Sequence, residues 1–446
     1  MKKGKICLIS LGCDKNLSDS QVMISLLEEA GFDTSADEYE CDIMLINTCC
    51  FIKDSLEESI ENILEAAQLK AEDPNKKIIV AGCIAQRYKD EVFKEIPEVD
   101  AIVGTTGFTD IVSVCEKVLS GEKAEALPDI NLPVDEDIAE KKVISAPNHY
   151  GYLKISEGCD KHCTYCVIPK IRGKQRSRTI ESLVREASRM ADAGVKELIL
   201  VAQDLAAYGS DIYGENSLYK LLPELEKVEG IEWIRLMYCY PENITDELID
   251  VIAKSEKICR YIDMPVQHGD DRILKLMGRK TTSAEIKEKI KKLREKIPDI
   301  AIRTSIIVGF PSEGEEEFEN LFNFVREIEF DRLGVFTYSR EEGTPAYDME
   351  GQIDEDVKIR RREIIMEEQM YISREKCESQ IGKEIPVIID GKIPEDGVYC
   401  GRGEKDAPDI DGMVFVRSAH ELESGEIVIV KITEAKDYDI AGDQVM

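Results

Sequence analysis

The 446-residue sequence has no apolar run as long as a membrane-spanning helix, which excludes a protein built on such helices. The apolar run near its start is also too short for a secretory signal peptide, so we expect a cytoplasmic protein. Positive charge is scarce, because 58 Lys and Arg face 90 Asp and Glu, a net charge of -32. Phosphate binding needs a basic surface, so this charge argues against a nucleic acid as the principal partner and favours a basic protein. Solubility alone would explain the charge equally well.

Cysteine, in contrast, is abundant. Fourteen cysteines in a cytoplasmic chain of this length indicate metal or redox chemistry rather than a disulfide framework. Three of them follow a short apolar run with the spacing Cys159-x-x-x-Cys163-x-x-Cys166. Three thiolates on one loop can hold a four-iron cluster and leave one iron open to a substrate or cofactor. A zinc site or chance spacing is the alternative.

The first part of the chain alternates strands with helices, which predicts a parallel sheet. We expect strands at 5–10, 43–46, 77–80 and 101–104, and helices from Ser18 to Gly31 and over 54–70. Cys13, Cys49 and Cys83 each come about three residues after one of these strands. The carboxyl ends of neighbouring parallel strands meet at one edge, so these cysteines would form a second triad. The alternative is that they are ordinary core residues.

The rest of the chain divides into a linker, a second α/β region and a tail. Residues 119–148 have little periodicity and are expected to be a linker. Six strands then alternate with helices, at 151–155, 197–201, 233–237, 261–264, 302–308 and 333–338. Eight such units close a full barrel, so six predict an open partial barrel. Short runs broken by glycines after Gln380 predict a small antiparallel barrel. The expected domains are 1–130, 145–375 and 380–446.

Four motifs give the chain a resemblance to the radical S-adenosylmethionine (SAM) methylthiotransferases along essentially its whole length. They are Leu11-Gly12-Cys13, Asn47-Thr48-Cys49, Ala81-Gly82-Cys83 and the Cys159–Cys163–Cys166 triad. The resemblance implies an N-terminal cluster domain, a radical SAM partial barrel and a C-terminal TRAM barrel. It also implies two [4Fe-4S] clusters, one on Cys159, Cys163 and Cys166 and one on Cys13, Cys49 and Cys83.

Within this family the chain looks like the members that modify an aspartate of the small-subunit ribosomal protein at the decoding centre. Residues 50–55, 149–158, 261–268 and 437–439 resemble those members, although they more often have glycine at the position of Cys50. The tail supports this choice, since it has 15 acidic and 7 basic residues. A barrel that grips tRNA should be basic. The alternative is a methylthiotransferase that acts on a tRNA adenosine.

The resemblance implies a division of labour between the two clusters. The cluster on the second triad would bind SAM at its open iron, and one electron would cleave SAM to a 5′-deoxyadenosyl radical. This radical would take a hydrogen from the β-carbon of the aspartate, which acid–base chemistry hardly reaches. The N-terminal cluster would supply the sulfur, methylated by another SAM, so each product would consume two SAM molecules. A non-catalytic iron–sulfur carrier is a further alternative, which predicts no SAM cleavage.

Six residues are expected near SAM. Gln203 and Asp204 end the second barrel strand, where they would bind SAM's polar groups or simply form a turn or helix cap. Arg303 lies in the fifth strand, and Gly309 lies in a segment, 307–311, that resembles the adenosine-contacting segment of the family. The other two are Tyr165, the aromatic residue before the third cysteine, and Arg172.

Arg172 belongs to a basic run, 170–178, in an otherwise acidic chain. It would neutralise a cluster's charge, hold SAM's carboxylate or bind the substrate's acidic side chain; a solvated loop is the alternative. The expected partners are a basic small-subunit ribosomal protein and a flavodoxin or ferredoxin reductant, and we expect a monomer. The sequence leaves open which aspartate is modified, the immediate sulfur source, and whether the substrate is the free protein or the assembled subunit.

Overall fold

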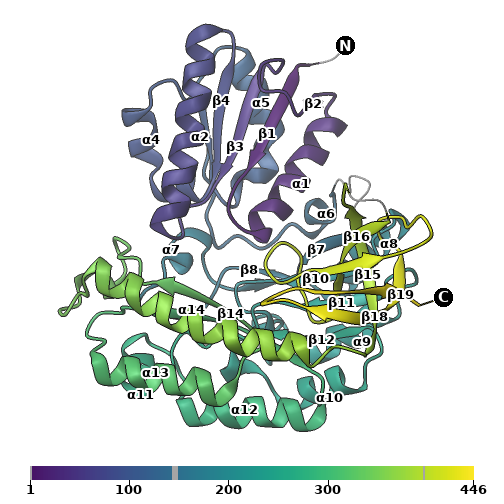
Figure 1. The fold of residues 1–446 in the computed structure, drawn as a ribbon. Coiled ribbons are helices and arrows are strands. Elements are labelled where there is room, and N and C mark those ends of the chain that lie inside the picture. The colour runs from purple at the N-terminus through teal and green to yellow at the C-terminus, as the bar shows by residue number, and fades with distance from the viewer. Residues whose placement is uncertain (1–2, 143–148, 395–396, 446) are drawn as a thin grey trace.

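The computed structural model describes residues 3–142, 149–394 and 397–445. The expected domain limits at residues 1, 145 and 446 therefore lie outside the described residues. The model has an N-terminal α/β region above a larger α/β region, with a small β-barrel beside them (Figure 1). In the described part of the chain, no helix is both long and apolar enough to cross a membrane.

The N-terminal region is a six-stranded parallel sheet in the order β2-β1-β3-β4-β5-β6. Helices α1 and α5 cover one face, where Met23 and Leu27 pack with Ile111, and α2, α3 and α4 cover the other. The strands are β1 (Lys5–Ser10), β2 (Asp33–Ser35), β3 (Ile43–Thr48), β4 (Lys77–Gly82), β5 (Ala101–Val103) and β6 (Ala124–Ala126), and the helices are α1 (Asp14–Glu29), α2 (Lys53–Glu72), α3 (Cys83–Arg87), α4 (Lys89–Glu95) and α5 (Ile111–Leu119).

Two details differ from the sequence-based expectation. The first helix begins at Asp14 instead of Ser18, because Cys13 takes the N-cap position with extended backbone angles and no side-chain cap. Ser18 and Ser20 are instead buried inside the helix. The expected linker contains β6, whose three residues are too few to show a period, and a short helix, α6 (Glu136–Ala139).

The second region is an open, six-stranded parallel sheet in the order β14-β13-β12-β11-β10-β7, which confirms the partial barrel. Its longer helices pack on the outer face in one large core, whereas the short helix Ile168–Arg172 packs with the N-terminal region. The strands are β7 (Tyr150–Lys154), β10 (Glu197–Val201), β11 (Trp233–Leu236), β12 (Ile258–Asp263), β13 (Ala301–Val308) and β14 (Arg332–Thr337), with a short hairpin of β8 (Ser156–Glu157) and β9 (Arg176–Ser177). The helices are α7 (Ile168–Arg172), α8 (Ile180–Asp192), α9 (Leu218–Glu226), α10 (Asp246–Lys254), α11 (Asp271–Leu276), α12 (Ser283–Lys296) and α13 (Glu315–Ile328).

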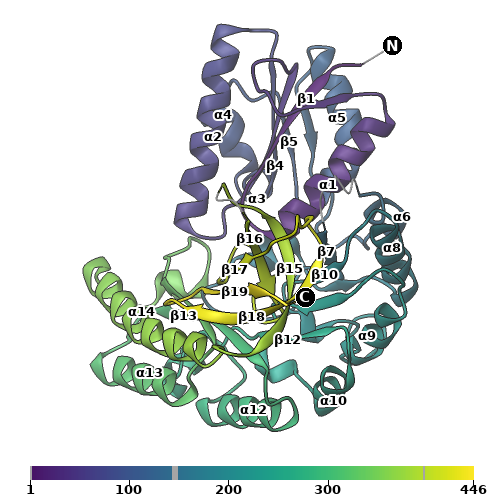
Figure 2. The ribbon, with the colours of Figure 1, turned by 45° about the vertical axis from the view of Figure 1, so that its right-hand side comes forward.

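Helix α14 (Glu355–Glu378) leads from the partial barrel to the closed C-terminal barrel, which lies in front of strands β10 to β12 (Figure 2). The barrel consists of β15 (Glu384–Lys392), β16 (Val398–Gly403), β17 (Val414–Arg417), β18 (Ile427–Ala435) and β19 (Ile440–Gln444). Its pairs are antiparallel apart from β17 and β19, which run parallel. Ile388 and Ala407 pack against Trp233 and Tyr261, so the small barrel fills part of the concave side of the open one.

Candidate functional site

Cys13, Cys49 and Cys83 lie together at one edge of the N-terminal sheet. Cys13 follows β1, Cys49 follows β3 and Cys83 opens α3 after β4. These strands are parallel neighbours, so their carboxyl ends meet. Burial raises the pKa of the Cys83 thiol above its usual range, and the nearby Cys49 and Cys13 raise it further. The three thiols therefore lie close enough to influence one another, and their role as cluster ligands stays a prediction.

Polar side chains hold these three loops against each other. The Asn16 amide donates to the carbonyls of Leu11 and Thr48, at 3.0 and 2.9 Å. The Asn47 amide donates to the Asn16 carbonyl at 2.9 Å, and the Thr48 hydroxyl donates to the Ala81 carbonyl at 2.6 Å. The asparagine and threonine before Cys49 thus fasten the three cysteine loops together.

Gly12 allows the first two of these loops to touch. Its φ is +88°, and a Cβ there would lie 2.9 Å from the Cys49 Sγ atom. Cys49 is also fixed from the other side, because its N–H donates to the Ser59 hydroxyl at 3.0 Å and its carbonyl accepts from the same hydroxyl at 2.9 Å. The backbone at this edge is therefore closely constrained around the thiols.

Cys159, Cys163 and Cys166 lie on the loop after β8, at the carboxyl end of the partial barrel. The Cys159 N–H donates to the Gly173 carbonyl at 3.0 Å, and the Cys166 N–H donates to the Cys163 carbonyl at 3.1 Å. Gly158 has a φ of +79°, and a Cβ there would lie 2.0 Å from the Lys174 carbonyl oxygen. Burial raises the pKa of Cys159 to about 11. Burial raises that of Cys166 too, and the other two thiols add to the effect.

Tyr165, between the second and third of these cysteines, lies against an apolar cluster that includes Met277, Phe310 and Tyr338. Its hydroxyl is buried and has no hydrogen-bond partner among the described residues. The neighbouring Thr164 ties the loop to the end of α11, because its N–H donates to the Met277 carbonyl at 3.0 Å. Tyr165 therefore packs the loop onto the barrel.

Arg172 links the two triads. It lies at the end of α7, which follows Cys166, and it is buried. Its guanidinium donates to Glu157 at 2.8 Å, to Asp19 at 3.3 Å and to the Asn16 side chain. Burial lowers the pKa of Arg172, but Glu157, Cys83, Asp19 and Cys13 outweigh it and hold the pKa well above its usual range. A side chain from the second triad's loop thus contacts Asn16 and Asp19 in the helix that follows Cys13.

Sequence reasoning missed most of this polar bridge, defined here as Asn16, Asp19, Lys154, Glu157 and Arg172. Lys154 donates to Asp19 and, at 2.8 Å, to Glu157, so it is charge-matched inside the protein. All five side chains are buried. Lys154 and Glu157 interrupt the apolar run that begins with Tyr152, and charged residues in a buried strand were the available signal.

Gln203 and Asp204 follow β10 and make hydrogen bonds within the protein. The Gln203 amide donates to Glu157 at 2.7 Å, while its buried Oε1 atom has no partner among the described residues. Asp204 accepts from Asn243 at 2.6 Å and pairs with Lys161 at 3.2 Å. Burial raises the pKa of Asp204, and its charge in turn acts on Cys159. Both residues lie next to the second triad.

Arg303 and Gly309 also have partners in the protein. Arg303 pairs with Asp263 at 2.8 Å and with Asp411 of the C-terminal barrel at 3.5 Å. Gly309 has a φ of +72°, and its N–H donates to Glu313 at 2.9 Å. Arg303 therefore joins the two barrels, and its expected contact with SAM stays a prediction, as does that of Gly309.

Lys15 lies between the N-terminal edge and the mouth of the partial barrel. It is the second residue of α1, and its Nζ atom lies 3.2 Å from the ring centroid of Tyr238, which follows β11. The Tyr238 hydroxyl donates to Asp14 at 3.2 Å, and the Tyr238 N–H donates to Asp263 at 2.9 Å. Sequence reasoning did not single out Lys15 or Tyr238.

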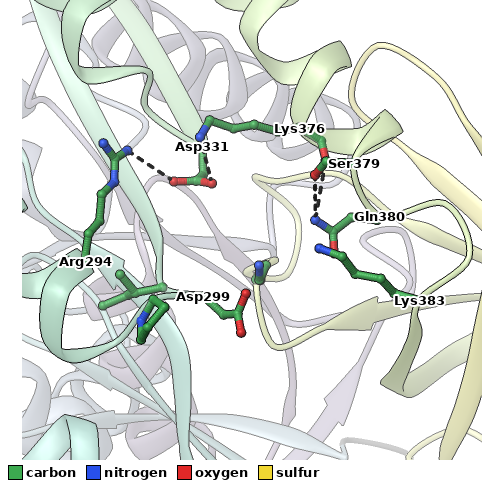
Figure 3. A pocket seen from close by; sticks show the side chains of 10 residues that line it. Arg294, Asp299, Asp331, Lys376, Ser379, Gln380 and Lys383 are labelled. Carbon is green, nitrogen blue, oxygen red and sulfur yellow. Dashed lines mark hydrogen bonds and ion pairs between the residues drawn. The ribbon is translucent and has the colours of Figure 1, made fainter.

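Two pockets lie away from the thiols. One, of about 410 Å³, lies behind the polar bridge, and its wall includes Asp19, Lys154 and Glu157. The other, of about 180 Å³, is drawn in Figure 3 and lies at the amino ends of β13 and β14, opposite the cysteines. There Asp331 pairs with Lys376 at 3.4 Å, which ties α14 to the open barrel.

The thiols suit iron–sulfur clusters. All fourteen cysteines are free, so no disulfide competes for the six candidate ligands. Among the described residues, no group of three His, Cys, Asp or Glu side chains is arranged for a single metal ion. A cluster makes a different demand, because each thiolate binds a different iron atom and the ligands stand farther apart. Thiols with raised pKa values release their protons when metal binds.

Comparison with known proteins divides the chain in the same way. Residues 5–104 match the model of the uncharacterized protein family UPF0004, residues 153–325 match the radical SAM superfamily, and residues 381–445 match the TRAM domain. The ribosomal protein uS12 methylthiotransferase RimO of Lachnoclostridium phytofermentans is 53% identical, over 98% of this chain and 99% of that protein. The protein of the same name from Acetivibrio thermocellus is 50% identical, over 99% and 98%.

A solved structure shares the fold at low sequence identity. The radical SAM methyltransferase TsrM from Kitasatospora setae, with cobalamin and a [4Fe-4S] cluster bound, aligns with a TM-score of 0.58 at 14% identity. The alignment covers 90% of this chain and 81% of that one. The partial barrel and the sheet before it therefore have a solved counterpart.

Proposed function

We propose that this chain, which belongs to the RimO family of radical SAM methylthiotransferases, adds a methylthio group to the β-carbon of an aspartate in a small-subunit ribosomal protein. The observation that carries the proposal is the 53% identity over nearly the full length of both chains, because it spans both cysteine triads and the tail. The C-terminal barrel belongs to an acidic tail, which suits a basic ribosomal protein better than tRNA.

The family's cofactors are [4Fe-4S] clusters and SAM. We assign one cluster to Cys13, Cys49 and Cys83 and the other to Cys159, Cys163 and Cys166. Each set offers three thiolates, which leaves one iron open to a ligand from outside the protein. When bound, these groups supply one-electron chemistry and sulfur, while the chain supplies position and shielding.

The chain's own residues have two tasks at this site. The polar bridge joins the segments that carry the two triads, because Arg172 extends from one triad's loop to Asn16 and Asp19 in the helix that follows Cys13. Its charge opposes the negative charge of the N-terminal thiolates, which favours the first of the roles expected for Arg172. Gln203 and Asp204 border the second triad, where SAM would lie, and the free Oε1 atom of Gln203 is available to it.

The remaining parts of the proposal concern partners and organisation. A flavodoxin or ferredoxin would deliver the electrons, and the chain would act as a cytoplasmic monomer. We propose domain limits of 1–130, 145–375 and 380–446, which limited proteolysis would test by cleavage near residues 130–145 and 375–380.

Mass spectrometry of ribosomal proteins and tRNA from a strain that lacks the gene tests the substrate. We expect one small-subunit ribosomal protein to lose the mass of a methylthio group, while methylthio-adenosine in tRNA stays at its normal level. Loss of methylthio-adenosine alone would overturn the proposal in favour of a tRNA substrate.

A further inference from the structure

Lys15 is a largely buried lysine whose ammonium contacts an aromatic ring but, among the described residues, forms no ion pair. Its side chain is 7% exposed, and its ammonium lies over the ring of Tyr238. In the part of the chain that the structure describes, the Lys15 Nζ atom makes no hydrogen bond and no ion pair within 4 Å. A buried charge without a partner is costly, so such a group indicates a ligand that supplies the opposite charge.

The acids around Lys15 already serve other groups. Asp14 accepts a hydrogen bond from the Tyr238 hydroxyl at 3.2 Å. Asp263 pairs with Arg303 at 2.8 Å and accepts from the Tyr238 N–H at 2.9 Å. The remaining charged groups that act on Lys15 are Cys13, a candidate cluster ligand, and Arg172, which the polar bridge neutralises.

A second feature at the same place also favours an anion. Lys15 lies in the first turn of the 16-residue helix α1, whose N-cap, Cys13, makes no side-chain cap. The first N–H groups of a helix are free to donate, and the helix dipole puts partial positive charge there. A lysine in this turn is repelled by the partial positive charge of the helix start, unless a bound anion offsets both charges. The helix start and the unpaired ammonium therefore point to the same ligand chemistry.

We propose that Lys15 and the first turn of α1 bind the carboxylate of the substrate's aspartate, an inference that rests on the proposed function. Lys15 lies two residues from Cys13 and beside the residues that follow β11 and end β12, so it stands between the N-terminal triad and the barrel mouth. The carboxylate carbon of aspartate is bonded directly to the β-carbon. A side chain that holds the carboxylate thus holds the reacting carbon within one bond.

The assignment makes Lys15 a specificity determinant. An ammonium pairs with a carboxylate and gains much less from the neutral amide of asparagine. A charge-assisted hydrogen bond contributes about 1.5–3 kcal/mol, which corresponds to roughly 10- to 100-fold in affinity. The protein should therefore prefer an aspartate substrate over its asparagine analogue by about that factor, and the preference should depend on Lys15.

The test measures binding of a substrate peptide to the anaerobically reconstituted enzyme with SAM and without reductant, so that no turnover occurs. Two peptides are compared, one with the modified aspartate and one with asparagine in its place. For Lys15→Met we expect the aspartate peptide to bind about 10- to 100-fold more weakly and the asparagine peptide to bind as before. Lys15→Arg keeps the charge and should keep the preference. The matched control, Lys89→Met, removes an exposed lysine at the start of α4 and should change neither affinity.

Three outcomes would count against the inference or its premise. An unchanged preference for aspartate in Lys15→Met would overturn the inference. So would a fall in the iron content of Lys15→Met from about eight to about four per chain, because Lys15 would then serve the cluster rather than the substrate. A wild-type enzyme that binds neither peptide and forms no product would instead overturn the proposed function.

Discussion

The N-terminal triad collects its thiols from loops after three different strands, whereas the second triad takes all of its thiols from one loop, residues 159–166. The first is held by buried amides and hydroxyls that cross between loops, such as those of Asn16, Asn47 and Thr48. The second is held mainly by backbone hydrogen bonds and apolar packing. A site assembled from distant segments needs a fold to bring it together, and it therefore depends on more residues outside its ligands.

The sharpest test of this comparison removes one ligand from each triad. Cys49→Ala and Cys163→Ala should each lower the iron content from about eight to about four per chain. Cys49→Ala should still cleave SAM under strong reductant but make no methylthio product, whereas Cys163→Ala should do neither. Iron and sulfide assays with mass spectrometry of 5′-deoxyadenosine would measure this.

The control for the cysteine variants is Cys115→Ala, in α5, because Cys115 is buried away from both triads. It should keep about eight irons and full activity. If Cys49→Ala and Cys163→Ala lost the same activities, the two triads would not have separate tasks.

A second prediction concerns the residue that joins the triads. Arg172→Met leaves Lys154 as the one cationic partner of Asp19 and Glu157 among the described residues, and breaking a buried ion pair costs about 3–5 kcal/mol. We expect the free energy of unfolding to fall by about this amount and cluster loading to fall at both triads. Arg172→Lys should recover only part of the stability, because an ammonium keeps the charge but cannot reproduce the several hydrogen bonds of the planar guanidinium. Loss of one cluster alone would show that Arg172 serves a single triad.

The same contrast explains what could be predicted from the sequence. The second triad is visible as a spacing, and the first as three strand-end positions, so both sets of thiols and the parallel sheets were predicted. The polar bridge was not, because its partners are far apart in the sequence: Asp19 meets Lys154, and Asn16 meets Arg172. Lys15 was missed for the same reason, since only the fold places it against Tyr238.

The residues expected near SAM illustrate a different limit. A strand-end position placed Gln203 and Asp204 beside the second triad, but it did not indicate the hydrogen bonds with Glu157 and Asn243. Arg303 was expected near SAM only because it lies in a barrel strand. In the structure it forms ion pairs with Asp263 and Asp411. A strand-end position places a side chain near a site but does not identify its partners.

A third prediction tests the side-chain hydrogen bonds that fasten the three N-terminal cysteine loops together. Asn47→Ala removes the hydrogen bonds from the Asn47 amide to the buried Asn16 carbonyl and Ser20 hydroxyl, which costs about 1–3 kcal/mol. We expect lower stability and incomplete loading of the N-terminal cluster, with the second triad fully loaded. The control, Asn62→Ala, removes an exposed amide that donates to the Glu58 carbonyl within α2. Its free energy of unfolding should stay within about 0.5 kcal/mol of that of the wild type. Equal iron loss at both triads would contradict the local role of Asn47.

The smallest expected effect lies outside both triads, where the C-terminal barrel contacts the open one. Asp390 accepts from Arg402 and pairs with His149 at 2.7 Å. Although burial opposes it, these partners hold the pKa of Asp390 below its usual range. A carboxyl group whose pKa is lower in the folded state adds stability above its unfolded pKa, about 3.9, and this stability is lost as pH falls through the folded pKa.

The single tryptophan, Trp233, packs against Ile388 and Ala407 of the C-terminal barrel, so its fluorescence reports the contact between the barrels. Trp233 fluorescence follows unfolding by denaturant. In the wild type, we expect the denaturant concentration at the midpoint to decrease when the pH is lowered below about 4. Asp390→Asn should be less stable by up to about 1 kcal/mol at neutral pH and should lose that part of the acid dependence. Iron content should stay the same at both triads, because Asp390 contacts neither set of thiols. If Asp390→Asn kept the full acid dependence, the contact between the barrels would titrate through another carboxylate. Glu197 is a candidate, because burial raises its pKa but Arg235 and Arg402 outweigh burial and hold that pKa below its usual range.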